Sequence, residues 1–243
     1  MAAKELHYGG HIFTIVYDIV NPACTDSIVI LHGWGSNKEI MKQAFGKLMP
    51  NFRHIYIDMP GFGRSTNHAV LTTQDYAGVI QKFLDYLSVK PRAILGHSFG
   101  GKVATLLNPP CLALLSSSGI LVPKPWSIRA KIALFKMLKP LGFSKLRSLF
   151  ASKDVQGMSH EMYETFKNVV NEDFESQFSN FTNTALLFWG KEDTATPLWT
   201  AKKIHSIMSN SILYPLSGDH YFFLKHASFI AKTITEICEG GEK

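Results

Sequence analysis

The sequence predicts an α/β fold, with a mostly parallel central sheet that carries helices on both faces. Two features support this prediction: short apolar runs alternate with longer segments of helical periodicity, and glycine-containing loops follow several of these runs. The chain has 243 residues, of which 46% are hydrophobic and 18% are charged, a balance typical of a globular protein and not of a disordered one. Its length suits one substantial domain.

The expected elements follow one another in order along the chain. Residues 11–19 are rich in β-branched and aromatic side chains and favour an early strand, which suits an antiparallel edge of the sheet. The continuous apolar run at 27–31 indicates a strand that is buried on both faces. The other expected strands are 53–57, 93–95, 112–115, 185–189 and 211–214, and the expected helices are 38–48, 73–88, 99–107, 199–208 and 222–238.

Residues 121–183 interrupt this alternation. The segment is helical in pattern and contains no strong strand run. Because a structureless connection of that length is uncommon in a compact domain, we predict a helical lid inserted over one end of the sheet. Residues 1–120 and 184–243 then form the core of the fold.

Half of the chain's formal net charge of +6 lies in the expected lid. Between 121 and 153 the lid has eight basic residues and no acidic one, interleaved with apolar side chains. Such a surface suits an acidic acyl carrier or an anionic lipid interface as partner, and it also suits a solvated helix face over an apolar pocket. No basic stripe or binding motif indicates nucleic acid as a partner.

Cys24, Cys111 and Cys238 show neither a CxxC motif nor the spacing of metal ligands, which favours a reducing compartment. No apolar stretch near the N-terminus resembles a signal peptide, and no run approaches the ~18 apolar residues of a membrane span. We therefore expect a cytoplasmic protein without a transmembrane segment. No cluster of ligands and no phosphate-binding loop implies a metal or an organic cofactor.

A Gly-x-Ser-x-Gly motif at residues 96–100 follows the expected strand at 93–95 and opens a helical segment. A nucleophilic serine on such a turn needs glycine neighbours, because larger side chains would collide at its strained backbone. The N-terminus of the following helix also directs its free N–H groups and positive dipole end toward developing negative charge. Ser98 is therefore the candidate nucleophile.

A serine hydroxyl becomes nucleophilic when a histidine takes its proton and a carboxylate orients that histidine. Asp193 and His220 follow the last two expected strands, where open α/β sheets place their sites. We predict Asp193 as the acid and His220 as the base. Glu192 and Asp219 are competing candidates for the acid.

Acyl transfer also needs N–H donors directed at the oxygen of the tetrahedral intermediate. One donor usually belongs to the residue after the nucleophile, and the other belongs to a loop after an earlier strand. The backbone N–H groups of Phe99 and Trp34 occupy these positions. Because only the backbone of Trp34 is needed there, its indole ring is available to line a substrate pocket or to pack against other side chains.

Five motifs, in this order, resemble the α/β-hydrolase superfamily, and together they span nearly the whole chain. They are residues 32–35 (His-Gly-Trp-Gly), 58–65, 96–101, 190–193 and 218–220. The resemblance implies the α/β-hydrolase fold and a hydrolase whose triad is Ser98, Asp193 and His220. It implies no catalytic group in the second motif, so Asp58 and Arg64 are assigned to a structural turn.

Within the superfamily, the first two motifs are similar to those of the pimeloyl-carrier-protein methyl ester esterases, which have tryptophan where this chain has His97. The meta-cleavage product hydrolases are less similar, since they usually have asparagine before the nucleophile and tryptophan after the catalytic histidine. Tyr221 takes the place of that tryptophan, and it is a candidate for the substrate pocket together with Trp34. Dehalogenases and epoxide hydrolases of this fold use a carboxylate nucleophile, which Ser98 excludes.

The sequence thus predicts a serine hydrolase that cleaves a small-molecule carboxylic ester or thioester through an acyl-enzyme. A carbon–carbon bond hydrolase of the 2-hydroxy-6-oxo-dienoate type is the alternative. A non-catalytic binding protein of the same fold is a third possibility, and the complete triad argues against it, because binding alone would not require those three residues. We expect His32 and His97, which lie inside motifs, to do structural work.

Overall fold

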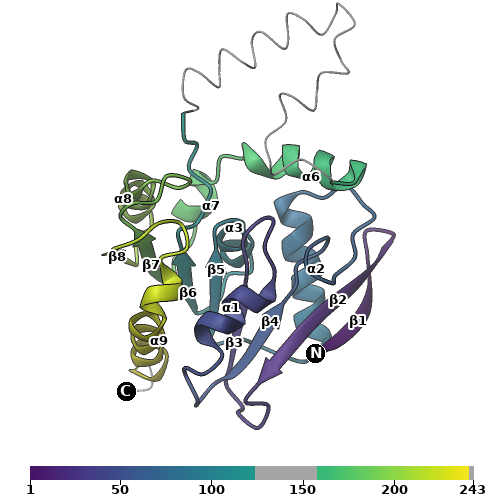
Figure 1. Ribbon diagram of the computed structural model, residues 1–243, viewed down its shortest axis with the longest axis horizontal. Coiled ribbons are helices and arrows are strands. Elements are labelled where there is room, and N and C mark those ends of the chain that lie inside the picture. The colour runs from purple at the N-terminus through teal and green to yellow at the C-terminus, as the bar shows by residue number, and fades with distance from the viewer. Residues whose placement is uncertain (124–157, 241–243) are drawn as a thin grey trace, which may run out of the picture.

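The computed structural model describes residues 1–123 and 158–240, and the strands within them form one eight-stranded sheet (Figure 1). The order of the strands across the sheet is β1-β2-β4-β3-β5-β6-β7-β8. The β1–β2 and β2–β4 pairs are antiparallel and the other pairs are parallel. The strands are β1 (Ala2–Tyr8), β2 (His11–Val20), β3 (Ser27–Leu31), β4 (Arg53–Ile57), β5 (Ala93–His97), β6 (Cys111–Leu115), β7 (Thr184–Gly190) and β8 (Ser211–Leu216).

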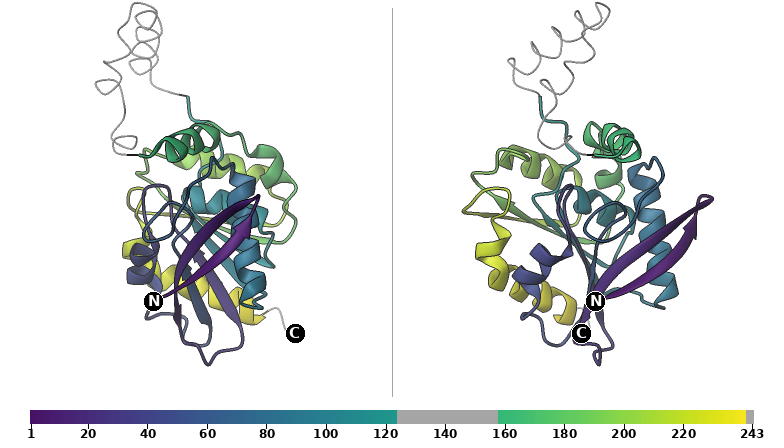
Figure 2. Two further views of the ribbon diagram at one scale, coloured as in Figure 1. Left: turned by 90° about the vertical axis from the view of Figure 1, so that its right-hand side faces the viewer. Right: turned by 45° about the vertical axis from the view of Figure 1, so that its right-hand side comes forward.

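Helices cover both faces of this sheet, so the predicted α/β architecture is confirmed (Figures 1 and 2). Helices α1 and α9 contact each other on one face, while α2 and α3 contact each other on the opposite face, where α8 also packs. Strands β3, β5 and β6 are buried along their whole length, which explains why their sequences are continuous apolar runs. The helices of the described chain are α1 (Lys38–Phe45), α2 (Thr73–Tyr86), α3 (Phe99–Leu106), α6 (His160–Val170), α7 (Glu175–Ser179), α8 (Leu198–Ile207) and α9 (Phe223–Gly240).

The edge of the sheet differs from the prediction. Residues 2–8, where the sequence indicated no strand, form β1, so that β2 lies inside the sheet and not at its edge. Of the side chains of β1 only Leu6 is buried, so the segment shows little apolar patterning. Its conformation is decided by pairing with β2 over its full length, a tertiary effect that a short window of sequence does not display.

The described residues of the expected lid are 121–123 and 158–183, and the second range contains helices α6 and α7. In all views α6 lies across the carboxyl ends of the central strands (Figures 1 and 2). Residues 124–157, which include all eight basic residues of the 121–153 run, lie outside the described residues, and the helical lid stays a prediction there. No helix of the described chain is long and apolar enough to cross a membrane.

Candidate active site

Ser98 lies on a sharp turn between the last residue of β5 and the first residue of α3. Its backbone has φ 51° and ψ −115°, a left-handed conformation that strains any residue with a side chain. The turn has no room at the flanking glycines: a Cβ on Gly96 would lie 2.4 Å from Gly100 O, and one on Gly100 would lie 2.5 Å from His32 O. The two glycines of the motif are therefore required by the close approach of neighbouring backbone.

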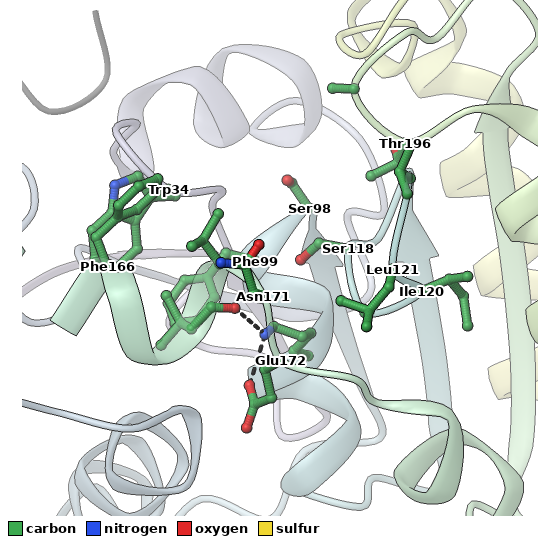
Figure 3. Close-up of a pocket in the computed structure, with 16 residues that line it drawn as sticks. Trp34, Ser98, Phe99, Ser118, Ile120, Leu121, Phe166, Asn171, Glu172 and Thr196 are labelled. Carbon is green, nitrogen blue, oxygen red and sulfur yellow. Dashed lines mark hydrogen bonds and ion pairs between the residues drawn. The ribbon is translucent and has the colours of Figure 1, made fainter. Parts of the chain in front are cut away.

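The backbone of the turn holds Ser98 firmly while its hydroxyl stays available. The Ser98 carbonyl accepts hydrogen bonds from Gly101 N at 3.0 Å and Ser118 N at 3.2 Å. The hydroxyl makes no hydrogen bond with any described residue, and Ser98 lines a cavity of about 310 Å³ (Figure 3). An oxygen in this position can meet a ligand without first breaking a bond to the protein.

The structure brings Asp193 and His220 together from the ends of β7 and β8. His220 Nδ1 lies 2.8 Å from Asp193 Oδ2, while Asp193 Oδ1 accepts the backbone N–H groups of Ala195 at 2.8 Å and Thr196 at 2.9 Å. Burial alone would raise the pKa of Asp193, but the hydrogen bond from His220 and its charge outweigh that effect and lower the pKa to about 2. An ionised carboxylate can only accept, so Nδ1 of His220 carries the proton and Nε2 is left as an acceptor.

The two competing acids have other partners. The Glu192 carboxylate accepts a hydrogen bond from Gly218 N, and Asp219 Oδ1 accepts one from Tyr221 N at 2.9 Å. Both contacts stabilise the loop that leads to His220, and neither carboxylate contacts the imidazole ring among the described hydrogen bonds. The geometry therefore places Asp193, and not its competitors, behind His220.

His97 and His32 are buried and hold loops of the site in place. His97 Nε2 donates to the backbone carbonyl of His220 at 3.0 Å, and His32 Nε2 accepts from Met59 N at 3.0 Å. Burial lowers the pKa of His97 to about 3, assisted by the nearby charge of His220, and burial lowers the pKa of His32 to about 4. Both rings are therefore neutral at physiological pH, as a structural role requires.

Asp58 and Arg64 form the turn that the second motif predicts. The Asp58 carboxylate accepts the backbone N–H of Lys38 at 2.8 Å and that of Arg64 at 3.1 Å. Through these two hydrogen bonds the buried Asp58 side chain, which is 1% exposed, connects the start of α1 to the loop after β4. Neither residue lines the cavity at Ser98.

The two residues predicted to supply oxyanion donors, Trp34 and Phe99, belong to segments that meet at the Ser98 turn. Phe99 is the first residue of α3, so its N–H has no acceptor within the helix. The loop of Trp34 follows β3, and its approach to the turn is close: a Cβ on Gly33 would lie 2.9 Å from His97 Nδ1. The Trp34 ring packs edge-on against Phe99, with 5.5 Å between centroids, and lies 5.4 Å from the ring of Phe166 on α6.

Of the two residues predicted for the substrate pocket, Trp34 lines the cavity and Tyr221 does not (Figure 3). Tyr221 is 40% exposed and its ring lies 5.3 Å from that of His97. A contact between Tyr221 and substrate stays a prediction. The indole N–H of Trp34 is buried and has no hydrogen-bond partner in the described structure.

Sequence reasoning missed two residues of the site. Thr196 lines the cavity and its hydroxyl donates to Asp193 Oδ2 at 2.8 Å, so it helps to hold the acid. Lys102, four residues after Ser98, is buried at the cavity and forms an ion pair with Glu172 of the α6–α7 connection. A signal was present for Lys102, because a lysine one helical turn after the nucleophile interrupts an otherwise apolar and glycine-rich helix.

Fold and site together define a hydrolase of the α/β-hydrolase class, and the chain belongs to the alpha/beta hydrolase family, whose model matches residues 28–233. The motif-based resemblance to that superfamily is thereby confirmed. No group of three or more His, Cys, Asp or Glu side chains that could hold a metal ion occurs in residues 1–123 and 158–240.

Three relatives illustrate the similarity. The uncharacterized hydrolase YugF of Bacillus subtilis is 27% identical over 225 residues, which cover 78% of this chain and 81% of that protein. A pimeloyl-[acyl-carrier protein] methyl ester esterase of Yersinia pseudotuberculosis is 24% identical over 247 residues, which cover 89% and 94%. The esterase EaEST of Exiguobacterium antarcticum shares the fold with a TM-score of 0.73 at 22% identity, over 93% of this chain and 96% of that one.

Proposed function

We propose that this protein hydrolyses a carboxylic ester or thioester through an acyl-enzyme on Ser98. The observation that carries the proposal is the 2.8 Å contact between His220 Nδ1 and Asp193 Oδ2, at the end of the sheet that also presents Ser98 on its strained turn. The name of the Yersinia pseudotuberculosis relative, an ester hydrolase, supports the same class of reaction.

In this mechanism Ser98 Oγ attacks the ester carbonyl carbon while His220 Nε2 takes the hydroxyl proton. The backbone N–H groups of Trp34 and Phe99 stabilise the negative oxygen of the tetrahedral intermediate. Protonated His220 then gives its proton to the departing alcohol or thiol, and the acyl group stays on Ser98. A water molecule, deprotonated by His220, attacks this acyl-enzyme, releases the carboxylic acid and restores the serine.

Asp193 keeps the imidazole in the tautomer that this cycle needs. Its four hydrogen bonds, from Ala195 N, from Thr196 N and Oγ1 and from His220, hold the carboxylate in one orientation. The low pKa keeps Asp193 ionised whenever His220 becomes protonated, so the ion pair stabilises the imidazolium that forms during attack.

The partner stays a prediction. An acidic acyl carrier or an anionic lipid interface would meet the basic run between 121 and 153, whose residues from 124 onward lie outside the described structure. The carbon–carbon bond hydrolase stays the alternative, and two positions argue against it, because His97 and Tyr221 stand where those hydrolases usually have asparagine and tryptophan.

Labelling with a fluorophosphonate probe and turnover of short p-nitrophenyl esters test the proposal. We expect the wild-type protein to be labelled and active, and Ser98→Ala to lose labelling and about 10⁶-fold in kcat, the size seen when a triad nucleophile is removed. Ser206→Ala, which removes an exposed serine hydroxyl on α8, serves as the matched control. A folded Ser98→Ala protein with near-normal turnover would exclude the mechanism, and turnover of a dienoate diketone in place of esters would favour the carbon–carbon alternative.

A further inference from the structure

The cavity at Ser98 contains a buried positive charge that the proposed mechanism does not use. Lys102 lies on α3 four residues after Ser98, lines the same cavity, and its side chain is 2% exposed. Burying an ammonium group costs free energy unless the group is paired and hydrogen-bonded. The contacts of Lys102 show how many of its N–H donors have acceptors within the protein.

Two of the three N–H donors of Lys102 have acceptors. Nζ donates to the backbone carbonyl of Val169 at 2.7 Å and to Glu172 Oε2 at 2.7 Å. An ammonium group has three donors, and the third has no acceptor among residues 1–123 and 158–240. Burial lowers the pKa of Lys102, while the ion pair with Glu172 opposes that effect. The ammonium also lies 5.3 Å from the centroid of the Phe174 ring and 5.8 Å from that of Phe99, which lines the cavity, so its third donor has aromatic neighbours and no oxygen or nitrogen acceptor among the described residues.

The neighbouring wall of the cavity is polar as well. Asn171, the exposed residue that ends α6, also lines the cavity, and its side chain makes no hydrogen bond with the described residues (Figure 3). Ile120, Leu121 and Phe166 line other parts of the cavity with apolar surface. A few polar groups in a mostly apolar cavity fix the orientation of a ligand.

The proposed mechanism determines which part of the substrate reaches this wall. His220 must protonate the leaving group, so the leaving group lies on the side of His220. The cavity is lined near His220 by Thr196, whose hydroxyl lies 3.4 Å from His220 Nδ1, and elsewhere by Lys102 and Phe166. We take the acyl chain, which is the other substituent of the reacting carbonyl carbon, to extend away from His220 into the part of the cavity that Lys102 lines.

We propose that Lys102 and the amide of Asn171 form a subsite for an uncharged oxygen on the acyl chain, so that the preferred substrate is an ester of an oxo or hydroxy acid. This inference rests on the proposed function, because it assumes that the acyl carbonyl bonds to Ser98. Ser98 is the N-cap of α3 and Lys102 is the fourth residue of that helix, so their backbones lie roughly one helical turn apart, which places the oxygen a few bonds beyond the reacting carbonyl. Glu172, 2.7 Å from the same ammonium, would repel a second carboxylate, which is why the oxygen is uncharged.

Matched ester pairs test the subsite. The pairs are ethyl 5-oxohexanoate with ethyl hexanoate and ethyl 4-oxopentanoate with ethyl pentanoate, with kcat/KM measured by pH-stat titration. We expect the ratio of oxo to plain ester in the wild type to exceed the ratio in Lys102→Met by about 10-fold to 100-fold, the worth of one charge-assisted hydrogen bond. Lys167→Met is the matched control, because Lys167 is ion-paired with Glu164 on the outer part of α6 and does not line the cavity.

Two further variants distinguish recognition of the oxo ester by Lys102 from the attachment of α6 through the Lys102–Glu172 ion pair. Glu172→Gln keeps the Lys102 donors, so the preference for the oxo ester should persist even if both rates fall together. The double variant Lys102→Met, Glu172→Gln removes the buried cation without leaving an unpaired carboxylate, and it replaces Lys102→Met if that protein does not fold. Equal ratios in the wild type and the folded variant would overturn the subsite.

Ester binding to a variant that cannot hydrolyse esters distinguishes the test of this subsite from the test of the proposed function. In the Ser98→Ala background, calorimetry should show tighter binding of the oxo ester than of the plain ester, and the difference should vanish when Lys102→Met is added. That result supports the subsite even if the wild type hydrolyses neither ester, an outcome that would refute only the ester-hydrolase mechanism. Equal binding of the two esters to Ser98→Ala would overturn the subsite while leaving that mechanism intact.

Discussion

The two walls of the cavity are built in different ways. On the sheet side, Ser98 and the loop of Trp34 are held by backbone contacts so close that a Cβ on Gly96 or Gly100 would lie within 2.5 Å of a neighbouring carbonyl oxygen or carbon. On the side of α6, the wall is fastened by side chains: Leu71 N donates to Thr165 Oγ1 at 2.9 Å, Asn168 Nδ2 donates to Leu71 O at 3.2 Å, and Lys102 binds Glu172.

This difference in construction matches a division of roles in our proposals: the sheet-side wall carries the reacting groups, and the wall on the side of α6 contributes to substrate recognition. In the proposed mechanism, the closely packed backbone of the Ser98 turn holds the reacting groups in position, and such preorganisation is what acyl transfer requires. Side-chain fastening of α6 leaves the opposite wall free to vary in sequence without disturbing the turn at Ser98. We therefore expect changes on the sheet side to alter kcat strongly and changes on the α6 side to alter substrate preference, KM and stability.

The largest effect is expected on the sheet side, for Asp193→Asn. The new amide would keep its oxygen toward the N–H groups of Ala195 and Thr196, so its NH₂ would face His220 Nδ1 and force the wrong tautomer. By analogy with loss of the orienting carboxylate in other triads, kcat should fall on the order of 10³–10⁴-fold. Steady-state turnover of a p-nitrophenyl ester measures this change.

Glu192→Gln is the matched control for that substitution. A glutamine oxygen can still accept the hydrogen bond from Gly218 N, so the loop before His220 should keep its geometry and kcat should change little. If Glu192→Gln proved the more damaging of the two, the assignment of the acid to Asp193 would be wrong.

An intermediate effect concerns the pH dependence of stability through His97. In the folded protein the pKa of His97 is lowered to about 3, whereas an unfolded histidine has a pKa of about 6.5. Below pH 6.5 the unfolded chain binds a proton that the folded chain does not, so stability is full above that pH and declines as pH falls. The loss from this one group between pH 7 and 5 should be about 2 kcal/mol.

Urea unfolding of the wild type and of His97→Gln at the two pH values measures this loss. Glutamine can still donate to the His220 carbonyl but does not titrate, so the difference in unfolding free energy between the two proteins should narrow at pH 5. A difference that stays constant with pH would mean that folded His97 accepts a proton in this range.

The smallest effect on activity is expected on the α6 side, for Thr165→Val. The substitution keeps the shape of a fully buried side chain and removes the acceptor for Leu71 N. Leaving that N–H unsatisfied should cost about 1–3 kcal/mol of stability. KM for the preferred ester should rise a few-fold while kcat changes less, because the turn at Ser98 is untouched.

Thr235→Val is the control for that loss. Its hydroxyl donates only to Ala231 O within α9, far along the chain from the cavity. We expect Thr235→Val to leave KM unchanged. A similar rise in KM for both variants would show that the effect of Thr165→Val does not arise from a change in the attachment of α6.

Most of the fold could be predicted because its elements have strong local patterns. Strand β3 forms at the expected residues because a buried parallel strand is a continuous apolar run, and β4 also forms at the expected residues. β1 could not be predicted, because its stability comes from pairing with β2 and only Leu6 carries an apolar signal. Helix α1 ends at Phe45, earlier than expected, where Gly46 caps it.

By itself, the sequence determined the candidates for chemistry, because nucleophile, acid and base follow strands at spacings that the α/β-hydrolase motifs make recognisable. Only the tertiary structure separated Asp193 from Glu192 and Asp219, since neighbouring residues on a loop point in different directions and, among the described hydrogen bonds, only the Asp193 carboxylate contacts His220, at 2.8 Å; its role as the acid stays a proposal. It also brought Lys102 and Glu172, seventy positions apart in the sequence, to the same cavity. The physical reason is that a charge pair between distant segments leaves no periodic pattern in either segment, whereas a strained serine turn requires its glycines close by in the chain.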